Sequence, residues 1–342
     1  MRNRRIPVLI VAGFLGSGKT TLLNHLLTNN AGARIGVLVN DFGSINIDAM
    51  AVAGQVDSTL TLGNGCLCCA VDASGMDALL ERLARPGAEL DLIVVEASGL
   101  AEPREMIRMV LSATNPNIEF GGLVEVVDTV EFEGASDRHP SLERHLAFAD
   151  LIVLNKTDRV DAARRERMTR TVQELAGGAP VLPVSYGRIP TELLVEPRSA
   201  PATARVAEQL SFDQLRDDRA AGPHEPHLHA EYHSAEFACD EPLNPRALMR
   251  FLDDRPAGLY RLKGFVYFGV TGHKDKFTLH TVGTHLRVHR SRWSQGEQRR
   301  TQLVMIGSGI DAEDLTTKLR HCVETEPHQV DQQAILPILR HV

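Results

Sequence analysis

The sequence predicts an α/β domain with a mostly parallel sheet, followed by a smaller α+β domain. Three observations support this prediction. Short apolar runs alternate with helical stretches in the first half, a glycine-rich turn follows the first run, and the pattern changes near residue 196. Strands that alternate with helices are typical of a parallel sheet covered on both faces. We therefore expect a first domain at residues 1–195, a linker at 196–233 and a second domain at 234–342.

The apolar runs of the first domain are nearly continuous, without the polar alternation of a strand that faces water on one side. This pattern indicates parallel strands buried on both faces. The expected strands are residues 6–12, 35–39, 90–96, 123–128, 151–155 and 180–184, and the expected helices are 20–27, 76–83, 105–111 and 162–176.

The second domain has a different pattern. Asn244 and Pro245 supply an N-cap and a first-turn proline for a helix through Leu252. This domain contains no catalytic motif that we recognise. Its remaining expected elements are alternating strands at 259–270 and 277–282, a strand at 303–306 and a helix from Asp311 to about residue 323.

Composition limits the class of protein. The 342 residues fit two domains of roughly 150 residues each. A net charge of -7 argues against a nucleic-acid partner. Arginines before the apolar run 6–15 imitate a signal peptide, but residues 16–19 interrupt it, and no run reaches the roughly 20 apolar residues that span a bilayer. We expect a cytoplasmic protein without a membrane partner.

Residues 13–20 read G-F-L-G-S-G-K-T between a strand and a helix, which is the context that a phosphate-binding P-loop requires. Backbone N–H groups of such a loop point at phosphates. Lys19 would place a cation on the β- and γ-phosphates, and the Thr20 hydroxyl can ligate Mg²⁺. We expect a P-loop NTPase domain whose nucleotide site includes Gly13, Gly16, Ser17, Gly18, Lys19, Thr20 and Thr21.

The strand at 151–154 runs into Asn155-Lys156-Thr157-Asp158, an N-K-x-D sequence. Ligands of α/β folds bind at the carboxyl ends of strands. The Asp158 carboxylate can accept hydrogen bonds from N1 and N2 of guanine, a pair of donors that adenine lacks. Asn155 can bond the base from its other side, Lys156 can cover its face, and Ser185 is a further candidate contact. The nucleotide is therefore expected to be GTP; the alternative interpretation is an exposed turn.

Two segments are candidate switches. The apolar strand 90–95 ends in Glu96, which can hold Mg²⁺ through water or orient the attacking water. Gly99 can offer its N–H to the γ-phosphate. Asp41, after the second strand, belongs to the candidate first switch. Glu96 has an alternative interpretation as an acid at a helix start. No glutamine or arginine finger is evident, so we expect slow hydrolysis.

Cys66, Cys68 and Cys69 place three thiols in one turn. In a reducing compartment such a cluster indicates a metal or redox site rather than a disulfide framework. Soft thiolates suit Zn²⁺ and similar ions, and three ligands leave a fourth position open or filled from elsewhere. The alternatives are three small residues packed in a tight turn, or a redox role.

With these motifs the sequence resembles the CobW family of metal-handling GTPases, which are relatives of the urease- and hydrogenase-maturation GTPases. The resemblance covers nearly the whole chain, and the C-x-C-C motif is its most specific part. The matching segments are residues 13–20, 40–43, 65–69, 96–103 and 155–158, together with 261–265 and 303–307 in the second domain.

The resemblance implies a metallochaperone in which GTP and Zn²⁺ or Co²⁺ bind near each other, and hydrolysis changes the affinity for the metal. Carried over by position, the three cysteines would ligate the metal, and Asp41 would lie near the metal or Mg²⁺. Family members often carry Glu where this chain has Asp41 and Ser44, so a carboxylate ligand from this segment stays open.

The segment from His224 to His233 contains four histidines in ten residues. His227 and His229 would face the same side of an extended chain and could bind metal; the alternative is a solvated linker. For the whole protein, we expect delivery of Zn²⁺ to a client metalloprotein. Cobalt handling for cobalamin synthesis and a GTP-gated zinc buffer or sensor are the alternatives. The sequence leaves the client open, and the protein could be a monomer or a homodimer.

Overall fold

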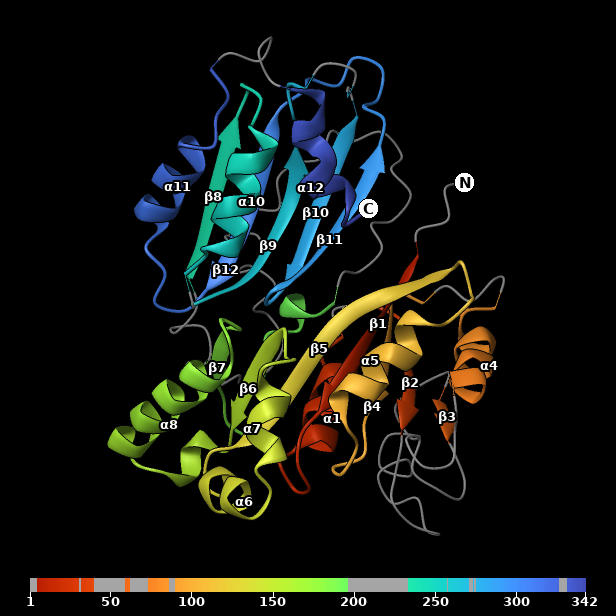
Figure 1. The fold of residues 1–342 in the computed structure, drawn as a ribbon, viewed down its shortest axis with the longest axis vertical. Coiled ribbons are helices and arrows are strands. Elements are labelled where there is room, and N and C mark those ends of the chain that lie inside the picture. The colour runs from red at the N-terminus through yellow and green to blue at the C-terminus, as the bar shows by residue number, and fades with distance from the viewer. Residues whose placement is uncertain are drawn as a thin grey trace, which may run out of the picture.

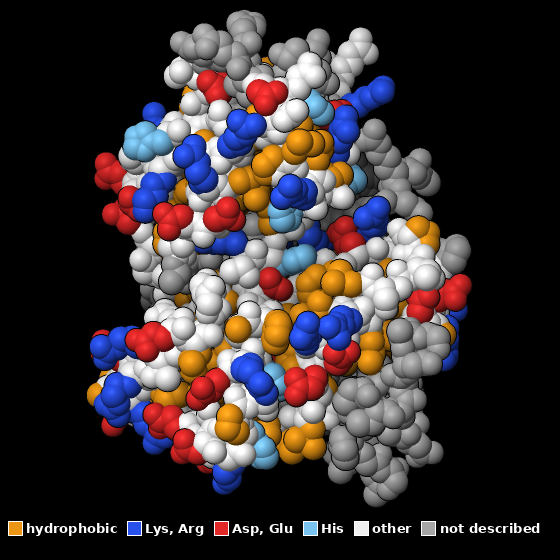
Figure 2. Space-filling view, viewed as in Figure 1, with side chains coloured by type: hydrophobic (Ala, Val, Ile, Leu, Met, Phe, Trp, Pro, Cys, Tyr) orange, Lys and Arg blue, Asp and Glu red, His pale blue; other side chains and the backbone are white. Residues whose placement is uncertain are grey.

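Two sheets organise the chain, one in each half of the sequence (Figure 1). Figure 2 shows side chains of both charges interspersed over the face drawn there. No described helix has the length and hydropathy of a membrane span. The computed structural model describes residues 5–30, 32–39, 59–61, 73–85, 90–195, 233–256, 258–270, 273, 275–325 and 331–342.

Within the described residues the first sheet has seven strands in the order β3-β2-β4-β1-β5-β6-β7, and its neighbouring strands pair in parallel. This confirms the predicted parallel sheet. The short β3 carries no pattern that a sequence could reveal, and β5 begins earlier than predicted because polar and glycine residues interrupt its apolar run. The strands are β1 (Ile6–Ala12), β2 (Ile35–Val39), β3 (Thr59–Thr61), β4 (Leu92–Glu96), β5 (Ile118–Asp128), β6 (Leu151–Asn155) and β7 (Val181–Pro183).

Helices cover both faces of this sheet. Two of them, α6 and α7, were not predicted, because they are too short to display a helical period of apolar residues. Short 3-10 turns η1 (Thr157–Arg159) and η2 (Thr191–Leu193) follow β6 and β7. The helices are α1 (Lys19–Thr28), α4 (Ala73–Leu83), α5 (Pro103–Leu111), α6 (Phe132–Arg138), α7 (Ser141–Leu146) and α8 (Ala162–Leu175).

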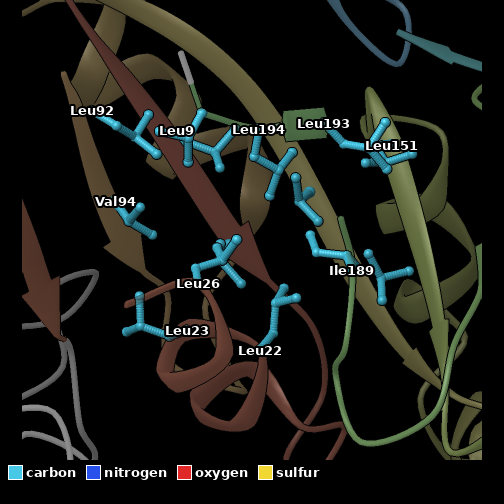
Figure 3. Close-up of a cluster of buried hydrophobic side chains, with 14 of the residues drawn as sticks. Leu9, Leu22, Leu23, Leu26, Leu92, Val94, Leu151, Ile189, Leu193 and Leu194 are labelled. Atoms are coloured by element: carbon cyan, nitrogen blue, oxygen red, sulfur yellow. The ribbon is translucent and has the colours of Figure 1, made fainter. Parts of the chain in front are cut away.

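One buried cluster lies between α1 and the sheet (Figure 3). Leu22 and Leu26 of α1 pack against Leu9 of β1, and Leu193 and its neighbours reach the same cluster from the segment after β7. Tyr260 and Val282 of the second sheet also belong to it. The two halves of the chain therefore share one core at this face.

The second sheet is antiparallel, in the order β11-β10-β9-β12-β8, with helices in front of it in Figure 1. This confirms the predicted α+β class. The first strand begins at His233, the last residue of the expected linker, whose other residues lie outside the described part. The elements are β8 (His233–Cys239), α10 (Pro245–Asp253), β9 (Leu259–Val266), β10 (Lys276–Val282), β11 (His285–Ser291), β12 (Thr301–Gly307), α11 (Ala312–Arg320), η4 (Gln332–Ile335) and α12 (Leu336–Leu339).

Candidate functional site

The glycine-rich loop joins β1 to α1 at the carboxyl edge of the first sheet, as predicted. Gly13 and Gly18 both have positive φ angles, 144° and 104°. A Cβ atom on Gly13 would overlap the carbonyl oxygen of Val126, and one on Gly18 would overlap the side-chain amide of Asn155. The close approach of strand ends therefore requires glycine at both positions.

Lys19 is buried, with 8% of its surface exposed, and it folds back over the loop. Its Nζ donates hydrogen bonds to the carbonyl oxygens of Gly13, at 2.8 Å, and Phe14, at 3.2 Å. The ammonium group therefore lies within the arc of the loop. This is where the sequence predicts a cation for phosphates.

Thr20 and Glu96 meet at the same edge. The Thr20 hydroxyl donates a 2.8 Å hydrogen bond to Oε1 of Glu96, the last residue of β4 and only 3% exposed. The strand end and the loop are thus brought together as expected. Hydroxyl and carboxylate oxygens are ligands that Mg²⁺ prefers, so the pair fits that ion.

The turn after β4 touches the tip of the phosphate loop. A Cβ on Gly99 would lie 2.7 Å from the backbone nitrogen of Leu15. Glu102, at the start of α5, contacts the ring of His145 on α7 at 3.1 Å. The contact of Gly99 with a γ-phosphate stays a prediction. Asp41 of the other candidate switch lies outside the described residues.

Asn155 links two loops, which the sequence did not predict. Its Nδ2 donates to the carbonyl oxygen of Ser17 at 2.9 Å, and its Oδ1 accepts from the N–H of Gly187 at 2.9 Å. Gly187 in turn lies against the backbone of Thr21 and Leu22 in α1. Asn155 therefore fixes the phosphate loop against the loop after β7, and its predicted contact with a base stays untested.

Lys156 has a positive φ of 62° and reaches over the phosphate loop. Its Nζ donates to the carbonyl oxygen of Gly16 at 2.7 Å and to Asp128 at 2.6 Å. Asp128, at the end of β5, was not among the predicted site residues. The signal that could have identified it is an acid at the carboxyl end of a largely apolar strand.

The N-K-x-D turn lies beside the end of β7. The Thr157 hydroxyl donates to the carbonyl oxygen of Val184 at 2.9 Å and lies 3.1 Å from the Ser185 hydroxyl. Asp158, in η1, is exposed to solvent. Ser185 and Asp158 thus belong to one edge, while their contacts with guanine stay predictions.

A second acid that the sequence analysis missed is Glu125, inside β5 and 4% exposed. It faces a pocket next to the phosphate loop. Burial raises the pKa of its carboxyl group to about 8, although the nearby charge of Lys19 lowers it. The signal available in the sequence was that Glu125 interrupts an apolar stretch of β5. The pocket is lined by Phe14, Leu15, Ser17, Glu125, Asp128, Glu131, Phe132 and Leu142, among others.

The predicted metal ligands Cys66, Cys68 and Cys69, and the histidines from His224 to His229, lie outside the described residues. Within the described ranges, no three His, Cys, Asp or Glu side chains come together as a metal site. The metal predictions therefore stay predictions.

Two family models match the chain. The model of the CobW/HypB/UreG nucleotide-binding domain matches residues 7–183, which include the phosphate loop and the N-K-x-D turn. The model of the cobalamin synthesis protein cobW C-terminal domain matches residues 232–323, which contain the second sheet.

Several characterised proteins are similar to the chain. The zinc chaperone CobW of Pseudomonas aeruginosa is 31% identical, with 92% of this chain and 91% of that protein covered. The zinc chaperone CobW of a Sinorhizobium species is also 31% identical, with 89% and 93% covered. The crystal structure of Zn(II)-bound YjiA GTPase from E. coli is 20% identical and covers 94% of this chain and 100% of its own, with a TM-score of 0.43.

Proposed function

This chain belongs to the CobW/HypB/UreG family of GTPases, and we propose that it is a zinc metallochaperone that binds Zn²⁺ and delivers it to a client metalloprotein. The family membership confirms the resemblance predicted from the motifs. Two relatives that are similar over most of the chain are named zinc chaperones, which supports zinc as the cargo.

The observation that carries the proposal is the gathering of Lys19, Thr20 and Glu96 at the carboxyl edge of one sheet. Asn155 is the first residue of the N-K-x-D turn, and its amide bonds both the phosphate loop and the loop after β7. The N-K-x-D turn therefore lies at the same edge of the sheet. A phosphate-binding loop beside a candidate guanine-reading turn is what GTP binding requires.

We assign Lys19 to the β- and γ-phosphates and Asp158 to guanine. Thr20 and Glu96 would hold Mg²⁺, which neutralises phosphate charge when it is bound. Gly99, next to the loop tip, is well placed to respond to the γ-phosphate. Loss of the γ-phosphate on hydrolysis would then change the conformation of the turn that contains Gly99, and this turn is the proposed switch.

We assign the cargo zinc to Cys66, Cys68 and Cys69, because thiolates are preferred zinc ligands. Asp41 lies between this motif and the phosphate loop in sequence, and with Glu96 it would relate metal binding to the nucleotide. A site with three protein thiolates has a fourth position through which zinc could pass to a client.

The test is hydrolysis of GTP and of ATP, with and without Zn²⁺, in the wild type and in Cys66→Ala and Cys68→Ala variants. Cys239→Ala is the matched control, because this cysteine lies in β8 of the second sheet. We expect GTP to be preferred, and zinc to stimulate hydrolysis in the wild type and the control only.

A rate of hydrolysis that does not change with zinc or with the cysteine substitutions would contradict the coupling of zinc binding to GTP hydrolysis. The protein would then be a zinc buffer or sensor. A parallel series with Co²⁺ separates the cargo metals. Stimulation by Co²⁺ at lower concentrations than Zn²⁺ would favour cobalt handling instead.

A further inference from the structure

A buried acid lies directly beside the phosphate loop. Glu125 of β5 stands opposite Ala12, the residue before the loop, in the parallel pairing of β5 with β1. Its neighbours Val124 and Val126 face the cluster around α1. Because side chains alternate along a strand, Glu125 faces the other side of the sheet, where it lines the pocket with Ser17.

Two polar atoms of this pocket have no hydrogen-bond partner within the described residues. They are Oε2 of Glu125 and Oγ of Ser17, whose side chains are 4% and 1% exposed. A buried carboxyl group with an oxygen that lacks a hydrogen-bond partner is costly as an anion and much less costly as the neutral acid. This cost is the reason why burial raises the pKa of Glu125 to about 8.

We propose that the carboxyl group of Glu125, which is buried beside the phosphate loop, must carry a proton whenever the phosphates of a nucleotide are bound. The inference rests on the proposed function, because it concerns the same phosphate loop. Lys19 is the cation whose charge acts on Glu125 and favours its ionised form. Phosphates bound to Lys19 neutralise that charge, so the anion of Glu125 loses its support.

The other charged groups around the pocket do not replace the positive charge of Lys19, which favours the ionised form of Glu125. Asp128 and Glu131 line the pocket and add negative charge. Lys156 is held by Asp128 at 2.6 Å. The ring of His139 lies tilted against the ring of Phe14, with centroids 5.3 Å apart.

Two further groups come from neighbouring elements. His145 of α7 is paired with the Glu102 carboxylate at 3.1 Å, and Glu96 of β4 accepts the hydrogen bond of Thr20. With phosphates in the loop, the surroundings of Glu125 therefore favour the neutral acid. A protonated carboxyl also supplies a hydrogen-bond donor, which the carboxylate anion lacks.

Nucleotide binding should accordingly be linked to proton uptake. Below pH 8 the carboxyl already carries its proton, and binding needs none. Above that pH, binding must take a proton from solvent, so the affinity should fall by about tenfold per pH unit.

The experiment measures the Kd of GDP from pH 7 to 9.5, at constant Mg²⁺, for the wild type, Glu125→Gln and Glu131→Gln. Glu131 lines the same pocket but is exposed, so its variant controls for the loss of an acid. Titration of guanine itself affects all three proteins equally. We expect the Kd to rise above pH 8 in the wild type and in Glu131→Gln. In Glu125→Gln the Kd should rise less steeply, so that its ratio to the wild-type Kd falls by about a factor of ten for each pH unit.

Calorimetry in buffers of different ionisation enthalpy counts the protons directly and needs only the wild type. We expect close to one proton taken up per nucleotide at pH 9. No uptake, or an equal pH slope in Glu125→Gln, would overturn the inference. A wild type that binds no guanine nucleotide at pH 7 would instead contradict the proposed function.

Discussion

The two ends of strands β5 and β6 differ in how their polar groups are held. The amino ends meet the second domain (Figure 1), and polar groups there have partners across the boundary. Glu119 pairs with Arg287 at 2.8 Å, and Asp150 accepts a 3.0 Å hydrogen bond from Thr284. The ring of His285 bonds the carbonyl oxygen of residue 120 at 3.1 Å.

The carboxyl ends of the same strands lie at the edge of the sheet that carries the phosphate loop. Groups there are held by the phosphate loop itself, as Asn155 and Lys156 are, or lack a hydrogen-bond partner among the described residues, as Oε2 of Glu125 does. The difference indicates that the amino end is built for a permanent contact and the carboxyl end for a ligand. The two ends belong to the same strands. The second domain therefore contacts the amino ends of the strands whose carboxyl ends adjoin the phosphate loop.

The largest expected effect on ligand binding is at the carboxyl end of these strands. Lys19→Ala removes the cation from the loop, and each charge-assisted hydrogen bond to a phosphate is worth about 1.5–3 kcal/mol. We expect GDP to bind at least about 100-fold more weakly in a fluorescence titration. Lys318→Ala, at an exposed ion pair on α11, should bind GDP like the wild type. Equal affinities of the two variants would show that Lys19 does not contact the phosphates.

At the amino end, Gly283→Ala should break the domain contact. A Cβ on Gly283 would overlap the carbonyl oxygen of Asp150. We expect a loss of more than about 3 kcal/mol in urea unfolding, as for other severe steric conflicts. Gly309→Ala is the matched control: its φ of 64° is close to the 54° of Gly283, but nothing lies within 4 Å. The control should lose only about 1 kcal/mol of backbone strain, and similar losses would contradict the proposed steric origin.

Glu125→Gln should stabilise the protein at neutral pH. The folded-state pKa, about 8, lies above the ordinary 4.5, so the unfolded chain ionises first and wild-type stability falls as pH rises between these values. We expect a gain of up to about 3 kcal/mol at pH 7 and almost none near pH 4.5. A gain that is the same at both pH values would contradict the ionisation argument.

The smallest of these effects should come from His285 at the domain contact. Burial and the charge of Arg287 lower its pKa from 6.5 to about 4, so the wild type loses stability as pH falls through this range. His285→Gln should remove about 1–2 kcal/mol of the change between pH 7 and pH 5. Asp150, whose pKa is raised to about 6, acts in the opposite direction in both proteins, so it cancels in the comparison. If the stability of His285→Gln changes between pH 7 and pH 5 as much as that of the wild type, the titrating group is not His285.

The sequence predicted the features that depend on local pattern. The apolar runs gave the parallel strands, and Asn244 and Asp311 cap their helices as expected, each accepting backbone N–H bonds of the first turn. The spacing of the glycines and Lys19 predicted the loop, because the residues of its motif all lie within residues 13–20.

Features built from distant residues could not be read in this way. Asp150 and Thr284 are 134 positions apart, and nothing in either segment indicates the other. The amide of Asn155 has its partners in two separate loops, so its linking role appears only in three dimensions. Glu125 was visible as an acid in an apolar strand, but its relation to Lys19 depends on the pairing of β1 with β5.

Control of zinc binding by the bound nucleotide is tested most directly by the Kd of Zn²⁺ in three states: nucleotide-free, with GDP, and with a non-hydrolysable GTP analogue. A chelator competition assay gives these values for the wild type and for Cys66→Ala. We expect the Kd to differ between the GTP-analogue and GDP states on the order of tenfold, and the variant to lose tight binding in each state. Equal zinc affinity in all three states would contradict it.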